Sequence, residues 1–297
     1  MKNWKFTLIF SLLSLSGPVF AETNAACVRS AGDILVSNST SPLVTDINGG
    51  TGSACKEAPD FYRLNFYRFG MCKVNPLSGA AFDFSSCSYL VNSTTPVAHV
   101  ISYPSTSSLA TNSVMEPGNY NFLILVLSNS LEQKHTETFS RSIRGKNSSG
   151  TTCWTIGVKT AYAGNAISGV TTTSPSPGTP STLGMDCGST PAPEYTTEIF
   201  EDFDDTGGFS ADSSNPAASV KLLQTDNLTL ATSPDDAKRI AVAMPMVREI
   251  KTTSSYEIGF KVVGSSSVDL HTSGVAGSTI TALKVGADPF QVSFTVN

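Results

Sequence analysis

Alternation of apolar and polar residues makes β-strands the main expected elements. Within residues 61–69, Tyr62, Leu64 and Phe66 fall on one face of an extended strand. The alternation then changes phase, so that Arg68 becomes the outward residue between two aromatic neighbours. A phase change inside one strand predicts a β-bulge.

A second strand is expected from an unbroken apolar run at residues 122–127. Such a run indicates a strand that is covered on both faces. Pro117 and Gly118 predict a turn just before it, and Tyr120 follows that turn. This order resembles the tyrosine corner, in which a tyrosine enters a core strand of a Greek-key sandwich.

The C-terminal part repeats short strands at intervals of about 8–12 residues, which is typical of all-β sandwiches. Gly, Asn, Asp and Pro separate these strands, and no long amphipathic helix is evident. We therefore expect an all-β protein with two β-sandwich-like modules of Greek-key type. The expected strands are 197–203, 220–225, 228–232, 239–244, 256–263, 267–271, 279–285 and 290–296.

A tract rich in Pro, Ser and Thr interrupts the strands between the two halves of the chain. Such composition favours a linker or a long surface loop. We therefore expect an N-terminal module at 22–165, a loop or linker at 166–196, and a C-terminal module at 197–297.

The N-terminus has the three parts of a secretory signal peptide. Lys2 and Lys5 are followed by an apolar stretch at residues 6–15, and cleavage is expected between Ala21 and Glu22. The apolar stretch is too short to cross roughly 30 Å of hydrocarbon, so we do not expect the chain to span a membrane. The sequence predicts secretion across the inner membrane, to the periplasm, the cell surface or the outside.

A lipid anchor is the alternative targeting signal. Small residues precede Cys27, which faintly resembles a lipobox. However, Asn24 stands where a leucine-like residue is expected, and Cys27 lies far beyond the apolar stretch. A cleaved and unanchored chain is therefore the preferred interpretation.

The cysteines fit an oxidising compartment. An even number of them in an exported chain predicts disulfides, although six cysteines can pair in many ways. Nearest-neighbour pairing closes compact loops and is the pairing that we expect. These residues are Cys27 with Cys55, Cys72 with Cys87, and Cys153 with Cys187.

The charge balance disfavours nucleic acid as a partner. Without Lys2 and Lys5, 17 basic residues of the original 19 remain against 24 acidic ones. The excess lies in residues 166–297, which carry 15 acidic and 7 basic residues. A surface of this sign repels phosphate backbones.

Four segments resemble parts of an uncharacterised family of exported, disulfide-containing, β-rich bacterial proteins. They are residues 63–72, 117–120, 237–242 and 286–292. The resemblance implies a bacterial, exported protein, and it supplies no catalytic residues.

An acidic segment is the best candidate for a metal. Asp202, Asp204, Asp205 and Asp212 lie close together among glycines, and Ca²⁺ prefers hard carboxylate oxygens. No glutamate closes the loop as it would in an EF-hand, and an acidic turn after a strand is more often only solvated. No other cofactor is expected.

The strand at 61–69 offers a candidate ligand surface. Tyr62, Arg63, Tyr67 and Arg68 could bind a cell-surface glycan or protein through aromatic faces and cations. Core packing of the aromatic residues is the alternative.

Three functional hypotheses follow. The first is a non-enzymatic cell-surface or periplasmic protein for adhesion, structure or ligand binding. The second is a secreted hydrolase or glycan-processing enzyme that uses carboxylates at 198–212. The third is a pilus-like subunit that assembles by strand addition, with Val292, Phe294 and Val296 in the donor strand.

Overall fold

The computed structural model describes most of the chain from residue 26 onward. The described residues are 10–11, 26–34, 55–79, 81–103, 107–108, 114–144, 147–157, 159–162, 171–172, 185–204, 208–213, 218–272, 280–287 and 290–297. The expected leader at 1–21 lies outside these residues apart from Phe10 and Ser11. Most of the expected linker, at 166–170 and 173–184, also lies outside them.

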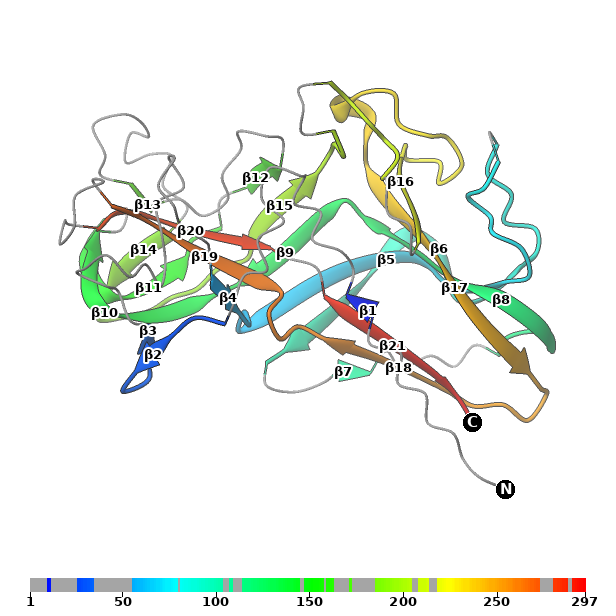
Figure 1. The fold of residues 1–297 in the computed structure, drawn as a ribbon, viewed down its shortest axis with the longest axis horizontal. Helices are drawn as coiled ribbons and strands as arrows, with labels where there is room; N and C mark the ends of the chain where they lie inside the picture. Colours follow the sequence, from blue (N-terminus) through cyan, green and yellow to red (C-terminus); the bar gives the residue numbers. More distant parts are fainter. Residues whose placement is uncertain are drawn as a thin grey trace.

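The fold is all-β, as the sequence predicts, and its sheets pack into two sandwich-like bodies (Figure 1). In the first sandwich, the large sheet has the order β12-β15-β9-β5-β8-β17-β16, and β6 pairs with β5. A smaller sheet, β1-β21-β18-β7, lies against it. The bounds in the large sheet are β5 Phe61–Cys72, β6 Cys87–Ser102, β8 Gly118–Ser128, β9 Ser130–Lys134, β12 Lys159–Tyr162, β15 Thr196–Phe200, β16 Ser219–Leu223 and β17 Arg239–Ile250. Those in the smaller sheet are β1 Phe10–Ser11, β7 Ser107–Ser108, β18 Tyr256–Lys261 and β21 Gln291–Val296.

The second sandwich is smaller and combines the sheets β14-β11-β10-β3-β2 and β13-β20-β19-β4. Its core surrounds two disulfides together with Phe139, Met185, Val268 and Val285. The bounds in the first sheet are β2 Arg29–Ser30, β3 Asp33–Ile34, β10 Thr136–Arg144, β11 Ser149–Thr155 and β14 Met185–Gly188. Those in the second sheet are β4 Cys55–Glu57, β13 Thr171–Thr172, β19 Ser266–Thr272 and β20 Ile280–Ala287.

The chain alternates between the two sandwiches instead of completing one before the other. Strands β4 and β5, β9 and β10, β18 and β19, and β20 and β21 each continue from one body into the other after a short break (Figure 1). The expected division at 166–196 therefore does not separate the sandwiches, because β17 pairs with β8 and β15 pairs with β9. Alternation of side chains identifies strands, but it carries no information about which distant strand is the partner.

Aromatic rings join the two sheets of the first sandwich. Phe66 of β5 lies 5.3 Å from Phe260 of β18, and Phe69 lies 5.9 Å from Phe294 of β21, measured between ring centroids. These spacings fall in the range in which tilted aromatic pairs attract one another. The contacts fix the smaller sheet on the inner face of β5.

Strand β8 is covered on both faces, which confirms the prediction from its unbroken apolar run. Leu123, Leu125 and Leu127 enter the core of the first sandwich. Ile124 and Val126 point to the opposite face, where the connection from β5 to β6 covers them with Leu77 and Phe84. We call this second apolar set the outer cluster; it also contains Cys72, Leu223, Ala241 and Ala243.

The tyrosine corner at the start of β8 is also present. The Tyr120 hydroxyl donates a hydrogen bond of 2.8 Å to the backbone carbonyl of Glu116. The ring is 1 % exposed and belongs to the main core. The bond satisfies the buried phenol while its ring closes the end of the sandwich.

The bulge in β5 lies where the pattern predicts it, because the register to both neighbouring strands shifts between Phe66 and Arg68. Its effect on the side chains differs from the expectation. Tyr67, not only Arg68, contacts the outer cluster, and Phe69 returns to the main core. An unpaired extra residue rotates the strand, and the alternation cannot show which residue is the extra one.

The expected strand at 228–232 is wrong, because this segment forms a turn with a single bridge between Leu223 and Leu230. The Asp226 carboxylate accepts hydrogen bonds from the backbone N–H groups of Leu228 and Thr229 at 2.9 and 2.8 Å. A side chain that caps its own backbone in this way competes with strand pairing.

Candidate functional site

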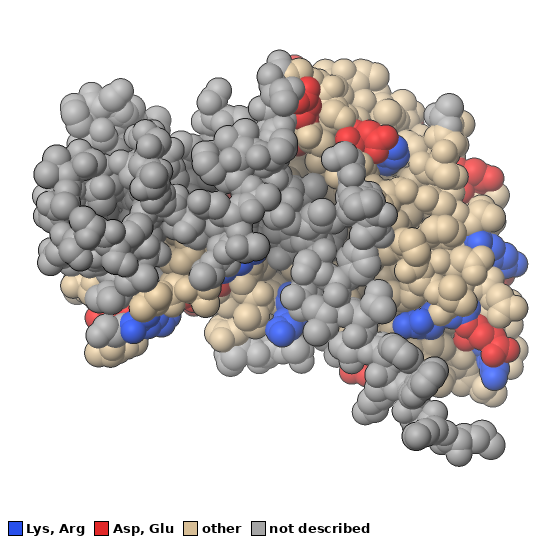
Figure 2. Space-filling model, in the orientation of Figure 1, with Lys and Arg blue, Asp and Glu red and all other residues tan. Residues whose placement is uncertain are grey.

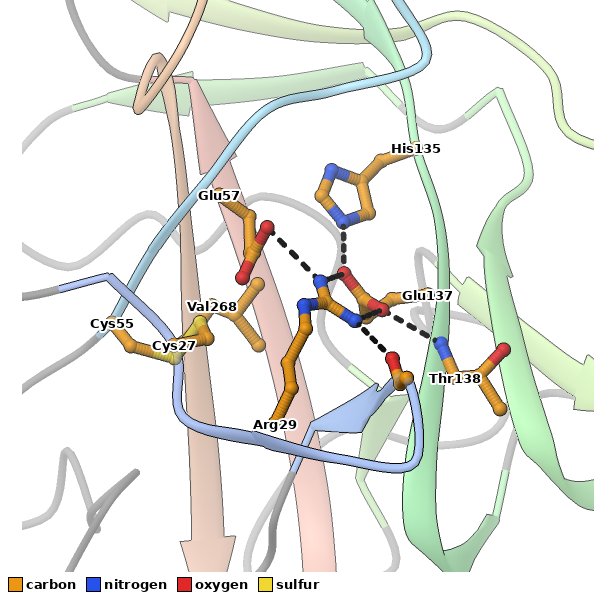
Figure 3. The surroundings of a disulfide bond; sticks show 9 residues. Cys27, Arg29, Cys55, Glu57, His135, Glu137, Thr138 and Val268 are labelled. Atoms are coloured by element: carbon orange, nitrogen blue, oxygen red, sulfur yellow. Dashed lines mark hydrogen bonds and ion pairs between the residues drawn. A yellow bond between two sulfur atoms is a disulfide. The ribbon is translucent and has the colours of Figure 1, made fainter.

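A polar group in the second sandwich surrounds Arg29, beside the Cys27–Cys55 disulfide (Figure 3). Nη1 and Nη2 of Arg29 donate to the two carboxylate oxygens of Glu137 at 2.9 and 2.7 Å. The same guanidinium lies 3.0 Å from the carboxylate of Glu57. A planar fork that meets a carboxylate with two parallel bonds is the strongest arrangement for such a pair.

Local backbone chemistry places Arg29 at this position. Ala31 and Gly32 have positive φ values of 53° and 94°, and they join β2 to β3. Two such residues form the tight hairpin turn that suits the twist of antiparallel strands. Arg29 Nη1 also donates to the carbonyl of Gly32 at 2.8 Å, so the hairpin orients its own guanidinium.

Glu137 is held ionised by its neighbours. Burial alone would raise the pKa of this carboxyl, but the His135 imidazole, the Arg29 fork and the backbone N–H of Thr138 together hold the pKa below its ordinary value. The Thr138 bond measures 2.9 Å, and His135 Nε2 lies 3.6 Å from Glu137 Oε2. At 3.6 Å the imidazole contact is electrostatic and is not a hydrogen bond.

His135 is the one residue between β9 and β10, and its side chain is 1 % exposed. Thr155 fixes the backbone there, because its N–H donates to the His135 carbonyl at 3.0 Å and its hydroxyl accepts from the His135 N–H at 3.2 Å. Together, Arg29, Glu57, His135 and Glu137 hold the N-terminal segment against the second sandwich, and we call these residues the Arg29 clamp.

In the acidic segment proposed for calcium, Asp202 and Asp212 already bond to other groups of the chain. One carboxylate oxygen of Asp202 accepts the N–H groups of Asp204 and Ser210, both at 2.8 Å. Asp212 pairs with Lys221, and Asp205 lies outside the described residues. In the described parts of the chain, no three His, Cys, Asp or Glu side chains gather as metal ligands would. Calcium binding at this segment stays a prediction.

The four residues of the expected ligand surface do not share one face. Tyr62 is fully buried in the main core, with its ring 5.8 Å from that of Phe290, so it is wrong as a surface residue. Arg63 lies on the opposite, partly open face of the sheet. Tyr67 and Arg68 contact the outer cluster.

Arg63 belongs to a polar set on the open face that the sequence did not reveal. Its Nε donates to Glu132 at 2.7 Å, and Asn65 donates to the same carboxylate at 3.1 Å. The guanidinium lies 3.9 Å from the ring centre of Tyr195, and the Lys134 ammonium lies 4.9 Å from it. The cross-strand register that creates this set cannot be deduced from alternation alone.

Residues from both alternative hypotheses, the enzyme and the pilus-like subunit, make contacts within the fold. Glu198 is 4 % exposed and accepts a hydrogen bond from the backbone N–H of Ala287. This bond joins β15 of the first sandwich to β20 of the second. The proposed donor strand is β21, which pairs along its length with β18 and buries Val292 and Phe294 in the core. In this structure β21 is thus committed to its own chain.

Asp186 is a further buried anchor. Its carboxylate accepts the backbone N–H groups of Asn147, Ser148 and Cys187 at 3.0, 3.1 and 2.9 Å. Burial alone would raise the pKa of Asp186, but these donors and the Asn147 amide hold it below its ordinary value.

Replacing Asp186 by Ala is expected to reduce the free energy of unfolding by about 2 kcal/mol, because three backbone donors lose a charged acceptor. Urea denaturation at neutral pH would measure the loss. Asp83→Ala is the matched control, since the Asp83 carboxylate accepts from one backbone N–H at the surface. Equal effects of the two substitutions would contradict the role given to Asp186.

Comparison with known proteins gives no relative: no family model, curated protein or solved structure matches the chain. Among the described residues there is also no helix with the length and apolarity needed to cross a bilayer. Function must therefore be argued from the residues themselves.

Proposed function

We propose that the protein is exported and works at the cell surface or in the periplasm as a non-enzymatic module for adhesion, structure or ligand binding. The observation that carries the proposal is the complete pairing of its cysteines. All six form disulfides, Cys27–Cys55, Cys72–Cys87 and Cys153–Cys187, which is the pairing that the sequence predicts. Such bonds persist in oxidising compartments and are rare in the cytosol.

The positions of the bonds support a stabilising role. Cys72 faces Cys87 on β5 and β6, and Cys153 faces Cys187 on β11 and β14. Cys27 joins the N-terminal segment to β4 next to the Arg29 clamp (Figure 3). A sulfur held in the Cys27 bond is not free to carry a lipid, which supports the unanchored alternative. Each sandwich thus has at least one covalent tie between its strands or segments.

The surface suits a protein that acts by contact. On the face shown in Figure 2, uncharged side chains cover most of the described surface, and charged groups are scattered among them. Three carboxylates of the 198–212 segment bond to other groups of the fold. Glu198 and Asp202 accept backbone N–H groups, and Asp212 pairs with Lys221. The partner class that we propose is a cell-surface glycan or protein.

Cell fractionation of a bacterial host that expresses the full chain with a C-terminal tag tests the export proposal. We expect the protein in the periplasmic or extracellular fraction, shortened by removal of residues 1–21. Without reduction, a maleimide reagent should add no mass, and after reduction it should label six thiols. Recovery in the cytoplasm at full length, with free thiols, would contradict the proposal.

A further inference from the structure

Two arginines lie on the outer face of the large sheet, and no described carboxylate forms an ion pair with either of them. Arg68 comes from β5 and Arg239 from β17, and in the described part of the chain neither guanidinium forms an ion pair. Strand β8 separates the two strands, with Val126 paired to both Arg68 and Ala241. Arg239 itself pairs with Ser128, two positions along β8, so the sheet brings two cations from distant parts of the sequence to the same face, one strand apart.

Arg239 is the more buried of the two, with 8 % of its surface exposed. Its guanidinium lies 3.6 Å from the ring centre of Tyr67 and donates to the side-chain oxygen of Asn227. The nearest acidic neighbour in sequence to that asparagine is Asp226, but its carboxylate caps the backbone of the 226–229 turn. Arg239 therefore has stacking and one neutral acceptor, and no described carboxylate forms an ion pair with it.

Arg68 leaves donors unused. Its guanidinium lies 4.5 Å from the ring centre of Phe84 and 5.7 Å from that of Tyr89. Nε and Nη1 are shielded from solvent and have no hydrogen-bond partner among the described residues. A shielded donor without an acceptor is costly, and in a native protein it indicates a bound water or ion.

The electrostatics at this place favour an anion. Burial lowers the pKa of Arg239, and the positive charge of Arg68 adds to that effect, which the Tyr67 ring and Asp226 only partly offset. Two like charges held in a weakly solvated place repel each other more strongly than they would in water. One anion between them would attract both cations and accept hydrogen bonds from the unused N–H groups of Arg68.

We propose that Arg68 and Arg239 form a binding site for a small oxyanion, either a carboxylate or a sulfate-like group. The planar guanidinium fork matches the paired oxygens of such groups, and the aromatic rings of Tyr67, Phe84 and Tyr89 form its walls. This site is independent of the export proposal.

Thermal unfolding in sodium sulfate, sodium acetate and sodium chloride at matched ionic strength tests the site. A ligand that binds the folded state should raise the midpoint of the full-length oxidised protein by about 2–4 °C, and this rise should follow the logarithm of the ligand concentration. Sulfate also stabilises proteins generally by exclusion from their surface, but that effect grows in proportion to concentration and does not depend on Arg68. We call the logarithmic, Arg68-dependent component the binding rise. A rise with acetate as well as sulfate identifies a carboxylate-compatible site, and a rise with sulfate alone identifies a tetrahedral one.

Arg68→Met is the decisive variant, because methionine keeps an unbranched apolar stem against Phe84 and removes the charge and the donors. The binding rise should disappear in Arg68→Met. It should remain in Arg63→Met, the control on the same strand, whose arginine is already paired with Glu132. If Arg68→Met does not fold, Arg68→Lys decides, since it keeps the charge but loses the fork and should weaken the apparent affinity about tenfold. The proposal is overturned if the wild type shows no binding rise, or if the Arg68 variants retain it in full.

Discussion

Replacing Cys153 and Cys187 together by alanine should lower the free energy of unfolding by about 4 kcal/mol. The bond closes a loop with a sequence separation of 34, and loss of that closure returns chain entropy to the unfolded state. Both cysteines are fully buried in the core of the second sandwich, so the alanines also leave space unfilled. Urea denaturation followed by the fluorescence of Trp154, the neighbour of Cys153, would measure the loss.

The pair Cys72→Ala with Cys87→Ala is the matched comparison. Its loop has a sequence separation of 15, and it lies in the first sandwich, so the expected loss is about 3 kcal/mol. An effect below about 1 kcal/mol for the Cys153 and Cys187 pair would show that neither loop closure nor core packing depends on this bond.

Arg29→Met should cost about 3 kcal/mol at neutral pH, because it leaves the buried Glu137 carboxylate without its counter-charge. The side chain of Glu137 is only 8 % exposed, and without Arg29 it keeps the Thr138 N–H donor but no hydrogen bond from His135. The matched control is Lys251→Met, which breaks a surface pair with Glu249 and should cost less than about 0.5 kcal/mol.

The pH dependence gives this prediction a second measurement. The pKa of Glu137 is lower in the folded protein than its ordinary value of about 4.5. The ionised carboxylate therefore adds stability above that ordinary pKa, and this stability disappears as the pH falls through the lowered value. The difference between the wild type and Arg29→Met should be greatest near pH 7 and should shrink in acid. A difference that stays constant down to strongly acidic pH would place the role of Arg29 in packing and not in charge.

The sequence predicts local features of this fold well and distant ones poorly. The bulge in β5, the two-sided burial of β8 and the tyrosine corner each depend on a few neighbouring residues. The disulfide pairing also follows from proximity along the chain. Tyr67 shows the limit, because the position of the extra residue in the bulge decides whether this ring faces the main core or the outer cluster.

The polar sites depend on pairings between distant segments, which no pattern in this sequence encodes. Arg29 and Glu137 are 108 residues apart, and Arg239 meets Tyr67 from a strand in the C-terminal part. Sequence reasoning selected Arg68 as a ligand residue but paired it with Tyr62, on the wrong face. A hairpin arginine beside a cysteine was the available signal for the Arg29 clamp, and it carries no indication of the partner.

The alternation of the chain between the two sandwiches has a consequence for biogenesis. Strands β18 and β21 belong to the first sandwich and β19 and β20 to the second, and all four are made last. A chain emerging N-terminus first therefore cannot complete the second sandwich before residue 287 or the first before residue 296. Long-range pairings of this kind slow folding and leave strand edges open in the meantime. Until then the chain must stay unfolded or be guarded by chaperones, and a truncation that removes both β20 and β21 should damage both sandwiches at once.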